Sequence, residues 1–411
     1  MALLFSLALR NALRHRRRSL LTSLTVTLGI GLLLLVLSWV HGVMGGAMHG
    51  AAHIAGEVRL VRPEFAQKEQ LFPLYANVAD AEPVVAAVRA VPGVVSVHPR
   101  ISLPMTLTVG DEIGEHFTLV QGAPIEWFTT IMGIDAHIET GRMMDGDKEI
   151  VLGKYAADEA GAKVGDTVYL LGQTQDGGMS GAKMKLVGIA DMGNSAQNRI
   201  SYVTMQKVQD LADIPGGALE ILAYGADPDE AGPLAAAVRA IPEAKGLEVQ
   251  AWNERAPFNG MVKMSGAIQL IFAGAVVFIT ALGVLNTMLM SVLERTGEIG
   301  VLRAMGLGRA QTVMLFVIEA IGIATVGGLL GVTMGGLVAW AWLERVGINL
   351  GGAAKSFPSA IPINSIMYGD VTLQHLVIGF LLGLLMAVVG SLIPALRAAG
   401  IQPVEAMRSR K

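Results

Sequence analysis

Three short segments of this 411-residue sequence hold residue types that could support chemistry. His49 and His53 are spaced i, i+4, with Glu57 one turn further on, so together they could in principle hold a metal ion. Gly153-Lys154-Tyr155 lacks the spacing and the final Ser or Thr of a phosphate-binding loop. Ser180 lacks the second glycine of a nucleophile elbow and is predicted in a turn. We therefore predict no catalytic residue, metal or cofactor here, and no enzyme activity by this chain alone.

The composition indicates a lipid environment. Hydrophobic residues make up 52% of the chain and charged residues 16%, whereas about a quarter of an average soluble protein is charged. The formal net charge of −3 argues against a nucleic-acid partner, which would need a basic surface. Because there is no cysteine, disulfides, thiol catalysis and thiolate metal sites are excluded.

Four apolar segments are long enough to cross a bilayer as helices. The predicted spans are residues 20–42, 263–293, 311–344 and 373–396. A cleaved signal peptide would also show basic residues before an apolar run. The first run is longer than the apolar core of a signal peptide, which favours an uncleaved helix.

Basic residues flank these spans on one side. They precede span one, lie between spans two and three, and follow span four, so residues 1–19, 294–310 and 397–411 are predicted to be cytoplasmic. Residues 43–262 and the loop 345–372 then lie outside. The expected location is the bacterial inner membrane, with both termini in the cytoplasm and the large domain in the periplasm.

The spans contain small and polar residues that call for an explanation. Gly327, Gly331 and Gly335 recur every four residues, as do Gly379 and Gly383, which allows close helix approach either within one chain or across a dimer seam. Two polar residues are predicted to be embedded in the membrane: Asn286 and Glu319. An ionisable group there marks a functional site or a bond to a neighbouring helix, and both interpretations stay open for Glu319.

The external segment is predicted to be α+β. Residues 81–99 and 230–252 resemble each other, and each places a short amphipathic helix before a β-rich stretch. The predicted architecture is an α/β lobe of residues 43–103 and 206–262 with an inserted β-rich lobe of residues 104–205. The fold class is therefore a membrane protein with four transmembrane helices and a large α+β extracytoplasmic domain.

The loop after span two, Glu294–Gly306, is the most informative stretch. A short charged helix here, continuous with span two, would be suited to docking in a groove of a cytoplasmic partner; a loop that only fixes topology is the alternative. The residues on one helical face and the arginines beside it are Glu294, Glu298 and Leu302, with Arg295 and Arg303.

The pattern E-R-x-x-E-I-G-x-x-R-A-x-G resembles the coupling-helix signature of ABC-transporter permeases of the FtsX/MacB/LolC–LolE superfamily. Residues 8–11 with the following arginines, 286–288 and 394–408 are also similar to family segments. The resemblance implies that the coupling residues contact an ATPase. The matching residues are Glu294, Arg295, Glu298, Ile299, Gly300, Arg303, Ala304 and Gly306.

The resemblance also implies a mechanism called mechanotransmission. Two permease chains, identical or different, would associate with two copies of a separate ATPase that binds ATP and Mg. Closure of the ATPases would push the coupling helices, and the motion would reach the external domains.

Within the superfamily, this chain looks most like the lipoprotein-releasing LolC/LolE permeases. These extract a lipoprotein from the outer leaflet of the inner membrane and pass it to a periplasmic carrier. MacB-like exporters of another amphiphile or peptide carry a fused ATPase, which is not among these residues, and FtsX-like signalling permeases have a smaller external domain; both stay open as alternatives.

In LolC-like members a protruding hook recruits the carrier. The matching hairpin here runs from Gln173 to Lys183 and is rich in glycine, so an ordinary turn is the other interpretation. The predicted carrier or substrate contacts are Gln173, Asp176, Met179 and Lys183.

Overall fold

The computed structural model describes residues 14, 16–110, 115–193, 196–256, 258–349 and 366–402. The chain divides into two compact units. The helical unit comprises Met1–Gly45, Lys263–Leu350 and Ile366–Lys411, and the sheet unit comprises Gly46–Val262 and Gly351–Ser365. Most of the predicted N-terminal helix 1–19, much of the 345–372 loop and the end of the tail lie outside the described residues.

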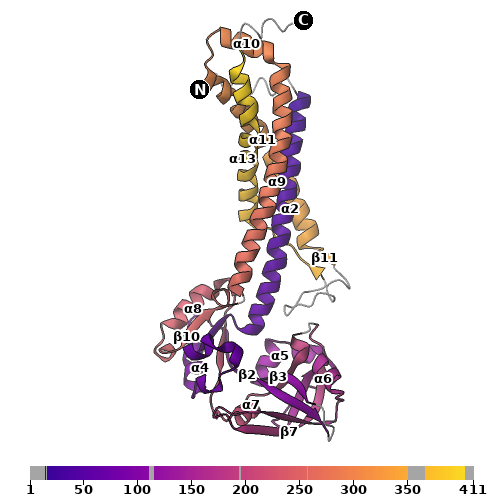
Figure 1. Cartoon of the computed structure of the whole chain (residues 1–411), viewed down its shortest axis with the longest axis vertical. Coiled ribbons are helices and arrows are strands. Elements are labelled where there is room, and N and C mark those ends of the chain that lie inside the picture. The colour runs from indigo at the N-terminus through magenta and orange to yellow at the C-terminus, as the bar shows by residue number, and fades with distance from the viewer. Residues whose placement is uncertain are drawn as a thin grey trace. The chain divides into compact units, whose positions relative to one another are not determined.

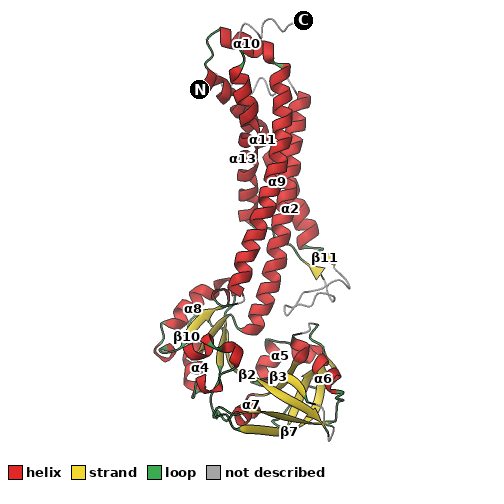
Figure 2. Cartoon of the chain, viewed as in Figure 1, coloured by secondary structure: helices red, strands yellow, loops and turns green. Residues whose placement is uncertain are grey.

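Four long helices make up most of the helical unit (Figures 1 and 2). Each contains a stretch long and apolar enough to cross a membrane: Arg17–Gly46, Phe258–Glu294, Arg309–Glu344 and Leu373–Gly400. The elements are α2 (Arg16–Ala55), α9 (Phe258–Glu294), α10 (Thr296–Ala304), α11 (Arg309–Val338), the π-helical η8 (Ala339–Glu344), β11 (Ile348–Asn349), β12 (Ile366–Met367) and α13 (Leu373–Gly400).

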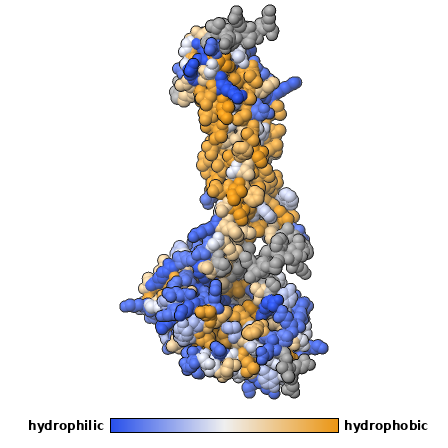
Figure 3. Space-filling view, viewed as in Figure 1, coloured by the Kyte–Doolittle hydropathy of each residue, from blue (hydrophilic) through white to orange (hydrophobic). Residues whose placement is uncertain are grey.

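The outer surface of these helices is apolar (Figure 3). On α9 alone, Leu270, Ile271 and Ile279 are each exposed by about two thirds or more. Helices satisfy all their backbone hydrogen bonds internally, so such a surface is stable in lipid. The four spans predicted from the sequence are therefore present as four helices, and α2 continues beyond the predicted end at residue 42 to Ala55.

The glycine repeats pack within the chain, against α2. A Cβ atom added at Gly335 would lie 2.6 Å from the Cα of Gly31, and Thr27 Oγ1 donates a hydrogen bond to the carbonyl of Gly327 at 2.9 Å. The absence of side chains lets the backbones approach this closely. The glycines whose added Cβ would meet α2 are Gly327, Gly331, Gly335, Gly379 and Gly383. Of the two interpretations, the structure shows intramolecular packing at these positions.

One path of paired strands runs through the sheet unit in the order β10-β1-β9-β2-β3-β8-β5-β7-β4, with β6 pairing with β2 and β7. The strands are β1 (Val58–Val61), β2 (Ser96–Val109), β3 (His116–Ala123), β4 (Ile138–Gly141), β5 (Glu149–Gly153), β6 (Thr167–Gln173), β7 (Met179–Ala190), β8 (Ile200–Thr204), β9 (Glu220–Tyr224) and β10 (Glu248–Ala251). The α-helices are α3 (Pro63–Gln67), α4 (Ala81–Arg89), α5 (Ile125–Thr130), α6 (Lys154–Ala160), α7 (Met205–Ala212) and α8 (Ala231–Arg239).

Strand β2 belongs to both lobes of this unit. Residues 96–100 pair with β9, whereas 101–107 pair with β3 and 106–109 pair with β6. The predicted lobe boundary between residues 103 and 104 falls inside this strand. Helix α4 precedes β2 and α8 precedes β10, which is the repeated helix-then-strand pattern expected from the two similar segments.

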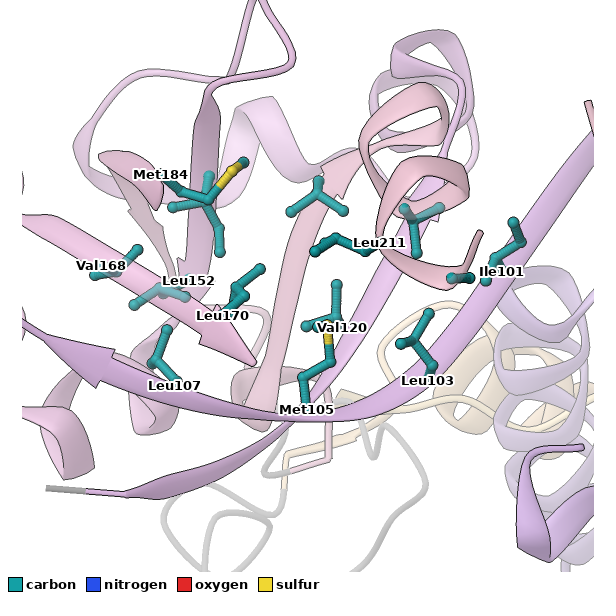
Figure 4. Packing of buried hydrophobic residues seen from close by; sticks show 14 of the residues in the cluster. Ile101, Leu103, Met105, Leu107, Val120, Leu152, Val168, Leu170, Met184 and Leu211 are labelled. Atoms are coloured by element: carbon teal, nitrogen blue, oxygen red, sulfur yellow. The ribbon is translucent and has the colours of Figure 1, made fainter. Parts of the chain in front are cut away.

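The main core of the sheet unit lies between the strands of the second lobe and α7 (Figure 4). Ile101, Leu103, Met105 and Leu107 alternate along β2 and are all buried, because successive side chains of a strand point to opposite faces. Leu211 of α7 covers this face. Ser180, predicted in a turn, lies in strand β7 instead.

Candidate functional site

The helix after span two is separate from that span. Helix α9 ends at Glu294, α10 begins at Thr296, and Arg295 between them has φ −107° and ψ 15°. The expectation of a helix continuous with span two is therefore wrong. After α10, Gly306 has φ +102°, a conformation that residues with a Cβ rarely adopt, and it turns the chain toward α11.

The inner face of α10 is packed against the helical unit. Arg295, Ile299 and Gly300 are buried, and the Arg303 guanidinium donates to the carbonyl of Ile401 just after α13. The residues that cluster around Ile299 come from three long helices: Val292, Phe316, Ala395 and Ala398. The buried coupling residues therefore attach α10 to the bundle and are not available to a partner.

The outer face of α10 is open. Four of the residues predicted to contact an ATPase are exposed: Glu294, Glu298, Ala304 and Gly306. Two apolar residues that the sequence analysis did not single out join them: Val301 is 47% exposed and Met305 is 72% exposed. Because Glu298, Val301 and Met305 follow one another at intervals of three and four, they share one helical face. That spacing was the signal that could have identified them.

A buried carboxylate ties α10 to two of the long helices. Glu319 of α11 has a fully buried side chain, and it accepts hydrogen bonds from Arg18 of α2 at 2.9 Å and from Arg295 at 3.2 Å. Arg295 also bonds Glu298 at 3.3 Å, and Glu298 lies 3.7 Å from Arg14. We call Arg18, Arg295 and Glu319 the helical charge cluster. Of the two interpretations of Glu319, the structure shows the bond to neighbouring elements.

Arg18 is the residue of this cluster that sequence reasoning missed. In the sequence, the arginines before the first span indicated only its orientation. Nothing in the neighbouring residues connects Arg18 to Glu319, which lies 301 positions away. Breaking a buried ion pair costs about 3–5 kcal/mol when one charge is left unpaired. Asn286, the other polar residue predicted in the membrane, stands apart from the cluster and is exposed on α9.

A second buried carboxylate lies in the sheet unit. Glu220 of β9 accepts from Arg59 of β1 at 3.0 Å and from Arg100 of β2 at 2.9 Å. Burial raises the pKa of Glu220, but the charges of Arg100, Arg59 and Arg255 more than offset it and leave the pKa at about 2. Burial also lowers the pKa of Arg255, to about 10. We call Arg59, Arg100, Glu220 and Arg255 the sheet charge cluster.

The sheet charge cluster holds the end of α2. Arg255 donates to the carbonyls of Ala55 at 2.7 Å and Gly56 at 2.9 Å, and Arg100 donates to that of Ile54 at 2.9 Å. The last carbonyls of a helix have no partner within it, and cations are favoured at that end. The carboxyl end of α2 is therefore fixed by two arginines, Arg100 on strand β2 and Arg255 in the segment between β10 and α9.

The candidate metal ligands are committed elsewhere. His53 lies 3.5 Å from Glu57, and the other carboxylate oxygen of Glu57 accepts from the Gly225 amide at 2.7 Å. The His49 side chain lies outside the described part of the chain. Among the residues that the structure describes, no three potential ligands converge on one point.

The hairpin matched to the carrier-recruiting hook is formed by β6 and β7, with Gln173 opposite Met179. Its turn is anchored, because Gln175 donates to the carbonyl of Asp213 at 2.6 Å. Asp176 is exposed in that turn, and Lys183 is exposed on β7.

A hollow of about 610 Å³ lies beside this hairpin in the sheet unit, and Gln173 and Met179 both line it. Its rim carries apolar side chains that are unusually open to water, such as Phe117 at 83% exposure. The apolar residues of the rim are Leu71, Tyr75, Phe117, Leu171 and Met179. Exposed apolar surface of this kind makes the hollow a candidate site for an apolar group.

Comparison with known proteins gives two family matches. The profile described as MacB-like periplasmic core domain matches residues 19–241, and the profile described as FtsX-like permease C-terminal matches residues 270–403. The first of these spans more than half of the chain.

Individual relatives align with different shares of the chain. The lipoprotein-releasing system transmembrane protein LolC of Xylella fastidiosa is 28% identical over 277 residues, which cover 64% of this chain and 65% of LolC. The macrolide export protein MacB of Brucella abortus is 40% identical over 103 residues, 23% of this chain and 16% of MacB. The solved periplasmic region of MacB from Actinobacillus actinomycetemcomitans aligns with a TM-score of 0.33 and 14% identity, over 48% of this chain and 88% of that one. The chain thus matches just under two thirds of the length of the LolC relative.

Proposed function

This chain belongs to the ABC-transporter permeases of the FtsX/MacB type and is similar to LolC, and from that premise we propose that it works by mechanotransmission. Two such chains, identical or different, would associate with two copies of a separate ATPase that binds ATP and Mg. The cargo would be a lipoprotein, extracted from the outer leaflet of the inner membrane and released to a periplasmic carrier.

The observation that carries this proposal is the two-sided construction of α10. Its outer face presents Glu298, Val301 and Met305 to solvent, which suits a groove on an ATPase. Its inner side is bonded through Arg295 to Glu319. A push on the outer face would therefore act on the bundle rather than bend a loose loop.

Helix α2 supplies the connection to the external domain. It is continuous from Arg16 to Ala55. Arg18 near its start bonds Glu319, and Ile54 and Ala55 at its end are held by Arg100 and Arg255. A displacement of α2 along its axis would thus be passed to the strands that carry the sheet charge cluster, since backbone hydrogen bonds on both sides of β9 fix them.

The apolar hollow beside the β6–β7 hairpin supports an apolar cargo or carrier contact. In this proposal Gln173 and Met179 contact the lipoprotein or the carrier, because they line the hollow. Asp176 and Lys183 are exposed beside them and would contribute to the polar rim of such an interface.

The proposed orientation can be tested directly, because the chain has no cysteine. We would introduce single cysteines at two exposed positions, Lys163→Cys in the sheet unit and Arg309→Cys at the start of α11. A membrane-impermeant maleimide should label residue 163 in cells with a permeabilised outer membrane, and residue 309 only after the inner membrane is opened. The reverse pattern would exclude the proposed topology.

The function itself is tested by purifying the chain from native membranes in mild detergent and identifying what stays bound by mass spectrometry. Recovery of a small ATPase with acylated lipoproteins would support lipoprotein release. An ATPase with a cell-wall hydrolase would indicate FtsX-like signalling, and one with an outer-membrane channel would indicate a MacB-like exporter. Loss of the ATPase, but not of the lipoprotein, from a Met305→Asp variant would place the ATPase contact on α10.

A further inference from the structure

A hollow of about 730 Å³ lies on the helical unit between the first turns of α2 and the last turns of α9. Of the coupling residues named above, Glu294 borders it. Its lining combines three arginines with polar and apolar side chains: Arg14, Arg17, Arg18, Leu21, Asn286, Thr287, Met290 and Glu294. Arg14 and Arg18 also pair with Glu298 and Glu319, which Arg295 shares. Counted together with Arg17 and Glu294, these described residues leave one excess positive charge at the hollow.

Arg18 has donors to spare in this hollow. Its Nη2 atom bonds Glu319, but Nε and Nη1 are buried and have no hydrogen-bond partner among the described residues. A buried donor without a partner costs about 1–3 kcal/mol, so an acceptor in the hollow would be favoured. Arg17 forms no ion pair within the described part of the chain, and it lines the same hollow.

The other wall of the hollow is apolar and belongs to the membrane spans. Leu21 of α2 and Met290 of α9 are each 56% exposed, and both lie within stretches apolar enough to cross a bilayer. Asn286, one turn from Met290, is exposed on the same helix. A polar amide at this level of a span needs a polar partner. The hollow therefore has a basic end formed by arginines and an apolar end formed by residues of the membrane spans.

We propose that this hollow binds an anionic phospholipid of the leaflet that faces α10. The exposed guanidinium groups of Arg14 and Arg17 would donate to the phosphate oxygens. Arg18 would join them through Nε or Nη1 after its side chain turns toward the hollow, because both atoms are buried. The Asn286 amide would bond the glycerol or ester oxygens, and the acyl chains would lie along Leu21 and Met290. Arg17, which forms no ion pair within the described part of the chain, and the one excess positive charge favour a lipid with net negative charge over a zwitterionic one.

Such a lipid would reach the helical charge cluster through Arg18. The same guanidinium that would hold the phosphate bonds the buried Glu319, which in turn bonds Arg295 beside α10. A bound phosphate would thus fix Arg18 in the position that the cluster needs. The inference concerns the leaflet lipid and does not depend on which cargo the permease moves.

The test is native mass spectrometry of the purified chain titrated with phosphatidylglycerol, phosphatidylethanolamine, phosphatidylcholine or inorganic phosphate. We expect phosphatidylglycerol to bind more tightly than either zwitterionic lipid. Arg17→Gln should weaken it about fivefold and Arg14→Gln with Arg17→Gln about thirtyfold, from about one kcal/mol per basic residue at a membrane surface. Asn286→Ala should weaken it without a change of charge.

The matched control is Arg309→Gln with Arg397→Gln, two exposed arginines outside the hollow, which should leave lipid binding unchanged. If the control weakened lipid binding as much as Arg14→Gln with Arg17→Gln does, the binding would reflect general charge attraction, and the proposed site would be overturned. Equal binding of phosphatidylglycerol and the zwitterionic lipids, or tighter phosphatidylethanolamine binding, would also overturn the proposal. Displacement of the lipid by millimolar inorganic phosphate would reassign the hollow to a soluble anion. Unchanged melting temperatures would show that the variants are folded.

Discussion

Glu319 in the helical unit and Glu220 in the sheet unit are both buried carboxylates between arginines, but different structures hold them. Around Glu220, Arg100 lies on the neighbouring strand directly opposite it in register, and Arg59 comes from β1 on the other side of β9. Around Glu319, the partners come from α2 and from the break between α9 and α10.

This difference determines what each cluster can do. Backbone hydrogen bonds fix the spacing of β1, β9 and β2, so the sheet charge cluster keeps its geometry unless the sheet itself opens. The distances in the helical charge cluster depend on how two long helices and one loop residue are placed, because helices slide against each other more easily than paired strands. The first arrangement suits a fixed attachment of α2, and the second suits a joint that responds to α10.

The largest effect on stability is expected for Glu220→Ala. This change would leave Arg59, Arg100 and Arg255 buried around a missing charge, at a cost of about 3–5 kcal/mol. Urea unfolding followed by tryptophan fluorescence should show it, with Glu149→Gln as the control. Glu149 pairs with the half-exposed Arg142, so its loss should cost less than about 1 kcal/mol. Equal costs would refute the idea that Glu220 fixes the sheet.

A loss of stability of similar size is expected when the pH is lowered. The pKa of Glu220 is about 2 in the fold against an ordinary value of 4.5, and a lowered carboxylate pKa stabilises the folded state above the ordinary value. As pH falls from 4.5 toward 2, about 3 kcal/mol should be lost. In Glu220→Gln this part of the pH dependence should be absent. Superimposable stability profiles of the two proteins over that range would contradict the assignment.

Glu319→Ala is expected to destabilise less, by about 1–3 kcal/mol. Arg295 keeps Glu298 as a partner, and Arg18 borders a hollow that can admit water. Its main effect should be on coupling, with ATP-driven release falling about tenfold or more in proteoliposomes while the purified complex still contains its ATPase. If Glu319→Ala lowered the free energy of unfolding as much as Glu220→Ala does, the helical charge cluster would be as rigid as the sheet charge cluster, and the contrast between them would be wrong.

The smallest effect on stability is expected for Glu298→Lys, because this side chain is about half exposed. The melting temperature and membrane insertion should stay within the error of the wild type, yet cargo release should be lost, since a lysine would face Arg295 and Arg14 and the ATPase groove. Glu294→Gln, one turn earlier and also exposed, is the comparison. Wild-type release by the Glu298→Lys variant would remove α10 from the proposed coupling pathway.

The sequence predicted the helices of this protein better than its charge clusters. Long apolar runs suffice for four spans, and the Glu294–Gly306 pattern located α10. The break at Arg295 was not visible, since its buried partner Glu319 is 24 positions away in the sequence. The sheet cluster was hidden for another reason. Arg59 lies in a short run of alternating residues, a pattern in which charged side chains usually point outward, but all four residues of β1 are buried because β9 and β10 flank it.

The glycines on α11 that face α2 recur every four residues, close to one helical turn, which corresponds to about 6 Å along the axis. If α2 moved by one such interval, the small residue Gly31, which now meets Gly335, would again face a glycine. Smaller displacements would press Gly31 and Thr27 against side chains such as Val332. If α2 slides along α11 as the proposed mechanism requires, this spacing would favour steps of about one helical turn over smaller displacements.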